Sequence, residues 1–219
     1  NFAFTFNNVN SSPFFPSSNF EKPGFSIGMQ PTNLSAGCST IEEWFSKMEE
    51  SWLEIISIFR GEKFIGIDSS IAPLYSGKSS LVNIIRQMKG SFPEAVTSDI
   101  FLKISGFIRE KNPLPAGLCG IMFPCLEDFE LADEYESGNF SIERNLFLSL
   151  HSGLGIDTYP IAKDESAERV LQILKLLSGL SDKYKKPLAA RFVCDGKSKI
   201  GEKSCFNNKY LKDIILRKL

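Results

Sequence analysis

The chain has 219 residues, of which 42% are hydrophobic and 23% charged, as in ordinary globular proteins. Its formal net charge of -1 argues against nucleic-acid binding, which needs a surplus of Lys and Arg. Five cysteines without a CxxC pair argue against a structural zinc site and a secreted disulfide framework, so we expect a cytoplasmic protein.

The first part of the chain predicts two strands, an aromatic loop and a long helix. Residues 2–6 alternate apolar and polar side chains, and 25–29 also read as a strand, while the prolines of 11–18 predict a loop that carries Phe14 and Phe15. Thr40 and Glu43 form a capping box, and apolar residues then recur at helical spacing until Gly61. Since the sequence opens on strand-like residues and not on Met, we interpret it as the carboxy-terminal portion of a longer polypeptide.

The rest of the chain alternates strands with helices. We expect strands over 64–67, 118–123, 156–161 and 188–193, and helices over 79–88, 97–108, 127–135, 141–151, 164–184 and 207–217. This order predicts one α/β domain over 1–219 with a largely parallel sheet, because helical crossovers join parallel strands. No apolar run approaches the roughly 20 residues that span a bilayer, and no signal peptide is visible, so we expect no membrane partner.

Carboxylates follow or interrupt three of the predicted strands. Asp68 follows 64–67, Glu127 and Asp128 follow 118–123, and Asp157 lies within 156–161. In parallel α/β folds the carboxyl ends of strands meet at one rim, where ligands bind. Such acids bind a divalent cation or transfer protons, or else they cap the helices that follow, a role that suits Asp68 and Asp128.

Arg191 lies inside the apolar strand predicted over 188–193, where an unpaired cation is costly. It either binds a substrate carboxylate through its two-pronged guanidinium or forms an internal ion pair with one of the predicted acids. Both readings remain open.

Two other motifs carry weaker signals. Ser76-Gly77-Lys78-Ser79-Ser80 resembles a phosphate loop, but Ala72 stands where that motif needs Gly, and a turn before a helix explains the residues equally well. His151 is the only histidine, and the cysteines offer it no clear partner, so a nucleophilic dyad is weakly supported.

Several ordered segments together resemble an uncharacterised family, domain of unknown function 711. The matching segments are Ser12-Pro13-Phe14-Phe15-Pro16, Phe25-Ser26-Ile27-Gly28, Phe64-Ile65-Gly66-Ile67-Asp68 with Ala72-Pro73, Gly120-Ile121-Met122-Phe123-Pro124 with Glu127-Asp128 and Leu131-Ala132, Gly153-Leu154-Gly155-Ile156-Asp157-Thr158-Tyr159-Pro160, and Lys186-Pro187-Leu188-Ala189-Ala190-Arg191 with Gly196 and Gly201. The chain departs from the family pattern at Ser152, at 162–164 and at 19–20.

The resemblance implies a pyruvate-formate-lyase-like α/β barrel made of two parallel sheets, without glycyl-radical chemistry. It also implies that an amino-terminal half of the family has no counterpart in this sequence. We therefore expect an enzyme or enzyme remnant that binds a small polar metabolite through Asp68, Glu127, Asp128, Asp157 and Arg191. The alternative is a non-catalytic scaffold whose aromatic loop, residues 13–20, binds a partner chain. That partner is a second copy of the chain or a chain that supplies the missing half.

Overall fold

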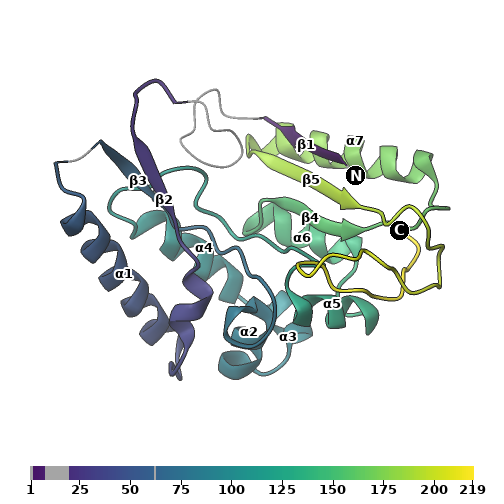
Figure 1. The fold of residues 1–219 in the computed structure, drawn as a ribbon, viewed down its shortest axis with the longest axis horizontal. Coiled ribbons are helices and arrows are strands. Elements are labelled where there is room, and N and C mark those ends of the chain that lie inside the picture. Colours follow the sequence, from purple (N-terminus) through teal and green to yellow (C-terminus); the bar gives the residue numbers. More distant parts are fainter. Residues whose placement is uncertain (1, 8–19, 62) are drawn as a thin grey trace.

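The computed structural model describes residues 2–7, 20–61 and 63–219 (Figure 1). The predicted loop over 11–18 lies outside these residues. The strands are β1 (Phe2–Phe6), β2 (Phe25–Gly28), β3 (Phe64–Asp68), β4 (Gly155–Pro160) and β5 (Leu188–Val193). The α-helices are α1 (Ile41–Ile58), α2 (Leu81–Lys89), α3 (Phe92–Val96), α4 (Ile100–Glu110), α5 (Phe129–Glu136), α6 (Ile142–His151) and α7 (Ala167–Tyr184), with short 3-10 helices η1 (Pro31–Ser35) and η2 (Gly77–Ser79).

The strands form two small sheets in a mixed α/β arrangement. One sheet has the order β1-β5-β4, in which β4 and β5 run parallel and β1 pairs antiparallel to β5. The other sheet is the parallel pair of β2 and β3. The expected parallel alignment therefore holds for β4 with β5 and for β2 with β3, while β1 pairs antiparallel at one edge.

An extended segment, residues 115–124, links the two sheets. It makes isolated parallel bridges to β3 and its continuation at Ile67 and Ile71, and to the β4 side at Gly153 and Asp157. The prediction of a regular strand over 118–123 is wrong, because Cys119 has a φ of 46° and Pro124 has no N–H to donate. The result is a row in the order β2, β3, 115–124, β4, β5, β1, and the described part of the chain shows no closed barrel.

Large aromatic side chains fill the space between this row and the helices. Trp44 and Trp52 of α1 are fully buried, and Trp52 packs against Phe107 of α4 at 5.4 Å between ring centroids. Figure 1 shows α1 beside β2 and β3, and α7 against the sheet of β1, β5 and β4. The capping box is present, since Thr40 accepts from the Glu43 N–H and the Glu43 side chain reaches back to the Thr40 N–H.

Other predicted boundaries need correction. The helix expected from 97 begins at Ile100, and the separate helix α3 precedes it. Ser166, and not Asp164, caps α7, while the Asp164 carboxylate accepts the Ile200 N–H at 2.9 Å. The helix predicted over 207–217 is wrong, since this segment forms turns and extended chain.

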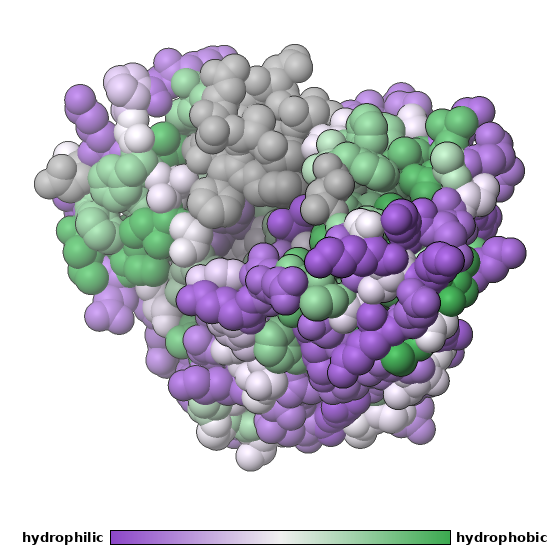
Figure 2. Space-filling view, turned by 45° about the vertical axis from the view of Figure 1, so that its right-hand side comes forward, coloured by the Kyte–Doolittle hydropathy of each residue, from purple (hydrophilic) through white to green (hydrophobic). Residues whose placement is uncertain are grey.

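The surface is mostly polar, with scattered apolar side chains. Figure 2 shows hydrophilic residues over much of the lower part of one face, with apolar residues gathered at its upper left and upper right. Exposed apolar side chains include Phe4 of β1 and Leu53 and Ile58 of α1. No described helix combines the length and the apolar composition that a membrane crossing requires.

Candidate functional site

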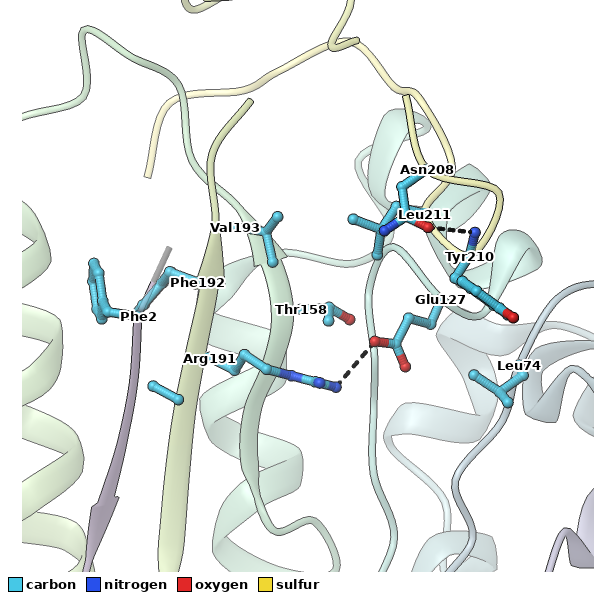
Figure 3. A pocket seen from close by; sticks show the side chains of 11 residues that line it. Phe2, Leu74, Glu127, Thr158, Arg191, Phe192, Val193, Asn208, Tyr210 and Leu211 are labelled. Atoms are coloured by element: carbon cyan, nitrogen blue, oxygen red, sulfur yellow. Dashed lines mark hydrogen bonds and ion pairs between the residues drawn. The ribbon is translucent and has the colours of Figure 1, made fainter. Parts of the chain in front are cut away.

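Arg191 joins two of the predicted carboxylates in one cluster. Its Nε donates to Asp157 Oδ1 at 2.6 Å, and its Nη2 donates to Glu127 Oε1 at 3.1 Å. Figure 3 shows the Arg191 side chain reaching from β5 toward Glu127. The internal ion pair, which the sequence left as one of two readings, is therefore present. We call these three residues the rim cluster.

The chain brings the rim cluster together through backbone contacts. Parallel pairing of β4 with β5 places Asp157 near Arg191. The Cys125 N–H donates to the Asp157 carbonyl at 3.0 Å, which holds the turn after Pro124 against β4. Glu127 follows this turn directly and so faces the guanidinium.

A cavity of about 590 Å³ opens beside the rim cluster. Glu127, Arg191 and Thr158 contribute polar groups to its lining, and Leu74 and the carboxy-terminal residues Tyr210 and Leu211 line it on the side of Glu127 (Figure 3). This volume is in the range of small-molecule pockets, which combine an apolar lining with a few convergent polar groups. Sequence reasoning missed the part played by Tyr210, because it placed 207–217 in a terminal helix.

The electrostatics of the rim cluster set Glu127 apart. Burial, together with the nearby Asp157 carboxylate, raises the pKa of Glu127 from 4.5 to about 6, although Arg191 acts in the opposite direction. The Arg191 side chain is 45% exposed, so water screens part of its attraction for the two acids. Glu127 is consequently able to take up and release a proton near neutral pH.

Thr158 adds backbone strain beside the rim cluster. Its φ is 38°, in the left-handed region that a β-branched residue rarely adopts, and the β4–β5 register shifts between Ile156 and Tyr159. Its hydroxyl Oγ1 is buried without a hydrogen-bond partner among the described residues. Such strain costs on the order of 1–3 kcal/mol and is often found where a ligand binds. No sequence signal marked Thr158.

The other two predicted acids lie outside the rim cluster. Asp128 is fully buried and caps α5, since its Oδ1 accepts the Leu131 N–H at 3.3 Å. Its Oδ2 accepts the Leu81 N–H at 2.9 Å, so the same carboxylate also caps α2. Asp68 is buried at the end of β3, where Oδ1 accepts the Ser70 N–H at 2.8 Å and Oδ2 has no partner within the described chain.

The phosphate-loop reading of 76–80 finds no support in the geometry. Gly77–Ser79 form a single 3-10 turn, and Ser80 caps α2. The Gly77 N–H donates to Glu130 Oε1 at 2.8 Å, and the Leu81 N–H donates to Asp128. Two carboxylates thus accept backbone donors that a phosphate would need.

Metal and nucleophile chemistry receive little support from the described residues. Within 2–7, 20–61 and 63–219, no group of three or more His, Cys, Asp and Glu side chains is arranged to hold a metal ion. Cys119 and Cys125 are buried free thiols whose pKa values burial raises, which disfavours the reactive thiolate. His151 contacts Ser152, with 2.6 Å between Nδ1 and Oγ, and lies at the end of α6, away from the rim cluster's cavity.

Comparison with known proteins identifies the family. No curated protein and no solved structure gives a significant match to this chain. The sequence model of the family described as Uncharacterised ACR (DUF711) matches residues 1–207, which is nearly the whole chain. The order of segments that resembled this family in the sequence is thereby explained, and the chain belongs to the DUF711 family.

Proposed function

We propose that this chain is an enzyme, or the remnant of one, that binds a small polar metabolite in the cavity beside the rim cluster. In this proposal Arg191 anchors a carboxylate of the metabolite, and Glu127 donates or accepts a proton. The observation that carries the proposal is the placement of Arg191, which contacts both acids while forming part of the cavity wall.

Arg191 has the free capacity that an anchor requires. A guanidinium carries five N–H donors, and the two acids engage Nε and Nη2 only. Its Nη1 has no hydrogen-bond partner in the described part of the chain. Asp157 holds the guanidinium in place at 2.6 Å, so the carboxylate of the metabolite, the third at this guanidinium, meets an already oriented Nη1 at little further cost in side-chain entropy.

Glu127 and Thr158 supply the remaining chemistry. A carboxyl group with a pKa of about 6 is suited to act as a general acid or base near neutral pH. Thr158 lines the same cavity, and its buried hydroxyl has no hydrogen-bond partner among the described residues. The buried Asp68 and Asp128 support the surrounding fold in this account and do not contact the metabolite.

Binding is tested by calorimetry with a panel of small mono- and dicarboxylates and hydroxy acids. We expect Arg191→Met to weaken binding of the responding ligand at least about tenfold, the value of one lost charge-assisted hydrogen bond. The matched control is Arg60→Met, since Arg60 is exposed after α1 and should leave binding unchanged. Arg191→Lys keeps the charge but loses the fork, so it should bind more weakly than the natural chain.

Two outcomes would remove this proposal. One is that Arg191→Met and Arg60→Met bind the responding ligand equally well. The other is that no carboxylate of the panel binds at all. Glu127→Gln separates binding from catalysis, because the amide still accepts from Arg191 but cannot transfer the proton. For a substrate that is turned over, it should retain binding and lose turnover.

We also propose that the row of strands is one arc of a pyruvate-formate-lyase-like barrel in the carboxy-terminal portion of a longer protein. Support comes from the two ends of the row, since β1 pairs only with β5 and β2 only with β3 among the described strands. Unpaired edges of this kind accept further strands. A second copy of the chain, or a chain that carries the remaining half, would complete the barrel.

The scaffold alternative uses the same edges and the aromatic loop over 13–20. Phe20, at the end of that loop, and Phe25, on the edge strand β2, are both exposed. Light scattering after size-exclusion chromatography tests the assembly. A mass of one chain at every concentration, with no co-purifying chain, would contradict both the completed barrel and the scaffold.

A further inference from the structure

A second cavity, of about 480 Å³, lies at the opposite ends of β4 and β5 from the strand-end rim. It opens between the end of α4, the end of α6 and the turn that joins α7 to β5. Ser152 precedes β4 and Lys186 precedes β5, and both line this cavity, whereas Asp157 and Arg191 lie within the two strands. The two cavities have no lining residue in common, and none of the rim cluster lines the second one.

The charged groups of this second cavity are all basic. Arg109, His151, Lys185 and Lys186 line it, and no Asp or Glu is among its described lining residues. Arg86, Lys103, Arg191 and Lys212 elsewhere in the described chain each pair with an acid, whereas none of the four basic groups of this cavity does so among the described residues. Arg109 has no ion pair or hydrogen bond to any described side chain.

The basic groups lie close enough to affect one another. Burial lowers the pKa of Lys186 to about 8, and the charge of Arg109 adds a smaller contribution in the same direction. Burial also lowers the pKa of His151, with a smaller contribution from the charge of Lys186. Lys186 therefore lies within electrostatic range of both Arg109 and His151, and all three line the same cavity. Its Nζ is held in position by donation to the Ser149 carbonyl at 2.8 Å, which leaves two of its three N–H donors for other partners.

Hydroxyl groups and apolar side chains complete the lining. Ser152 is buried and contacts His151, with 2.6 Å between its Oγ and the ring Nδ1, and Ser105 of α4 contributes a second hydroxyl. Leu118, Leu150 and Leu154 cover another part of the wall. The Ser105 hydroxyl already donates to the Leu102 carbonyl at 3.2 Å, so the cavity offers cations and the Ser152 hydroxyl on one side and an apolar surface on another.

We propose that this cavity binds a small phosphorylated metabolite, with the phosphate group held by Arg109 and Lys186. Two neighbouring cations match the charge of a phosphate dianion, whereas a single carboxylate would leave one of them uncompensated. The two remaining N–H groups of Lys186 donate to phosphate oxygens, and so does the Ser152 hydroxyl when His151 Nδ1 carries the ring proton. The leucine side chains contact the organic part. The site is independent of the rim cluster, so it does not require the function proposed above.

The test adds inorganic phosphate as the probe and measures the melting temperature of the chain. Chloride replaces phosphate in the reference samples, so that the ionic strength stays constant. We expect a saturable rise in the melting temperature of the natural chain. Arg109→Met should lower the affinity for phosphate, read from the concentration that gives half of the rise in melting temperature, at least about tenfold, since a hydrogen bond to a charged group is lost. Lys186→Met should do the same. Lys175→Met is the matched control, because Lys175 is exposed on α7 and lines neither cavity.

Each outcome decides the proposal. A phosphate response that disappears in Arg109→Met and persists in Lys175→Met supports it. An equal response in all variants, an equal response to chloride, or no response in the natural chain overturns it. If succinate stabilises the chain and phosphate does not, the assignment to phosphate is wrong. Lys186→Met also loses its contact with Ser149, and if this variant fails to fold, Arg109→Met decides alone, since Arg109 has no such contact.

Discussion

Replacing Glu127 by Gln should change how the stability of the protein depends on pH. Burial and the neighbouring Asp157 raise the pKa of Glu127 from 4.5 to about 6 in the folded chain. The folded protein therefore binds this proton more tightly than the unfolded chain does. The resulting stabilisation is fully present below about pH 4.5 and is lost as the pH rises through about 6.

The size of this effect follows from the two pKa values. A change from 4.5 to about 6 corresponds to about 2 kcal/mol, since each pKa unit is worth about 1.4 kcal/mol. The Glu127 side chain is only 19% exposed, so screening by water removes little of this value. Gln cannot ionise, but its oxygen still accepts the hydrogen bond from Arg191. The variant should lack this part of the pH dependence while it keeps the fold.

Urea unfolding between about pH 4 and about pH 8 measures the effect. Relative to Glu127→Gln, the natural chain should lose about 2 kcal/mol of its unfolding free energy across this range. Glu54→Gln, at an exposed position of α1, is the control and should follow the natural chain. If the unfolding free energies of the natural chain and Glu127→Gln change in parallel with pH, the reasoning is refuted. So would a natural chain that gains stability relative to the variant, because the Arg191 pair would then dominate over burial.

Three further substitutions test the framework around the site by urea unfolding at neutral pH. Asp128→Ala should cost about 2–3 kcal/mol, because one carboxylate caps both α2 and α5; a loss below about 0.5 kcal/mol would show that these caps contribute little. Gly155→Ala should cost about 3 kcal/mol or more, since its φ is 117° and a Cβ would lie 2.0 Å from the Ala189 carbonyl oxygen; a stable variant would contradict this packing. Thr40→Ala should cost about 1 kcal/mol through loss of the capping box, and an unchanged midpoint would count against it.

Local signals in the sequence predicted many of the elements. The capping box at Thr40 and Glu43 marks the start of α1 because both of its hydrogen bonds form within four residues. The apolar stripe of α7 and the apolar run of β5 are equally local, and both elements are present. The exact start of α7 was not predictable in the same way, since Asp164 and Ser166 are both residue types that favour the N-cap position. The folded structure places Ser166 there.

The carboxy-terminal segment shows where the sequence was ambiguous. Ile214 and Leu216 are buried while Ile215 is 43% exposed, an alternation that belongs to extended chain. A short apolar run does not distinguish this pattern from one face of a helix. Contacts from elsewhere decide it, since the Arg217 N–H donates to the Tyr135 hydroxyl at 2.8 Å and Lys212 pairs with Asp133 at 2.6 Å.

Part of the candidate site was predictable from the sequence, and the rest depended on contacts between distant segments. A cation inside an apolar strand needs a partner, so the sequence offered an internal ion pair as one of two readings of Arg191. The sequence suited Asp128 to a capping role, which is confirmed, but it did not assign its neighbour Glu127 to the ion pair with Arg191. The two acids separate because α5 begins at Phe129, which turns the Asp128 side chain onto the helix N–H groups and leaves Glu127 toward β5. Thr158 had no signal, since its strain arises from a register shift between β4 and β5.

The most direct test of the central claim, that Arg191 anchors a carboxylate of a small metabolite, is a proton–nitrogen correlation spectrum of the arginine side chains during a carboxylate titration. We predict that the Nε–H signal of Arg191 shifts in a saturable manner, while that of Arg169, which pairs with Glu143 on the surface, stays in place. An Arg191 signal that does not move with any carboxylate of the panel would contradict the account.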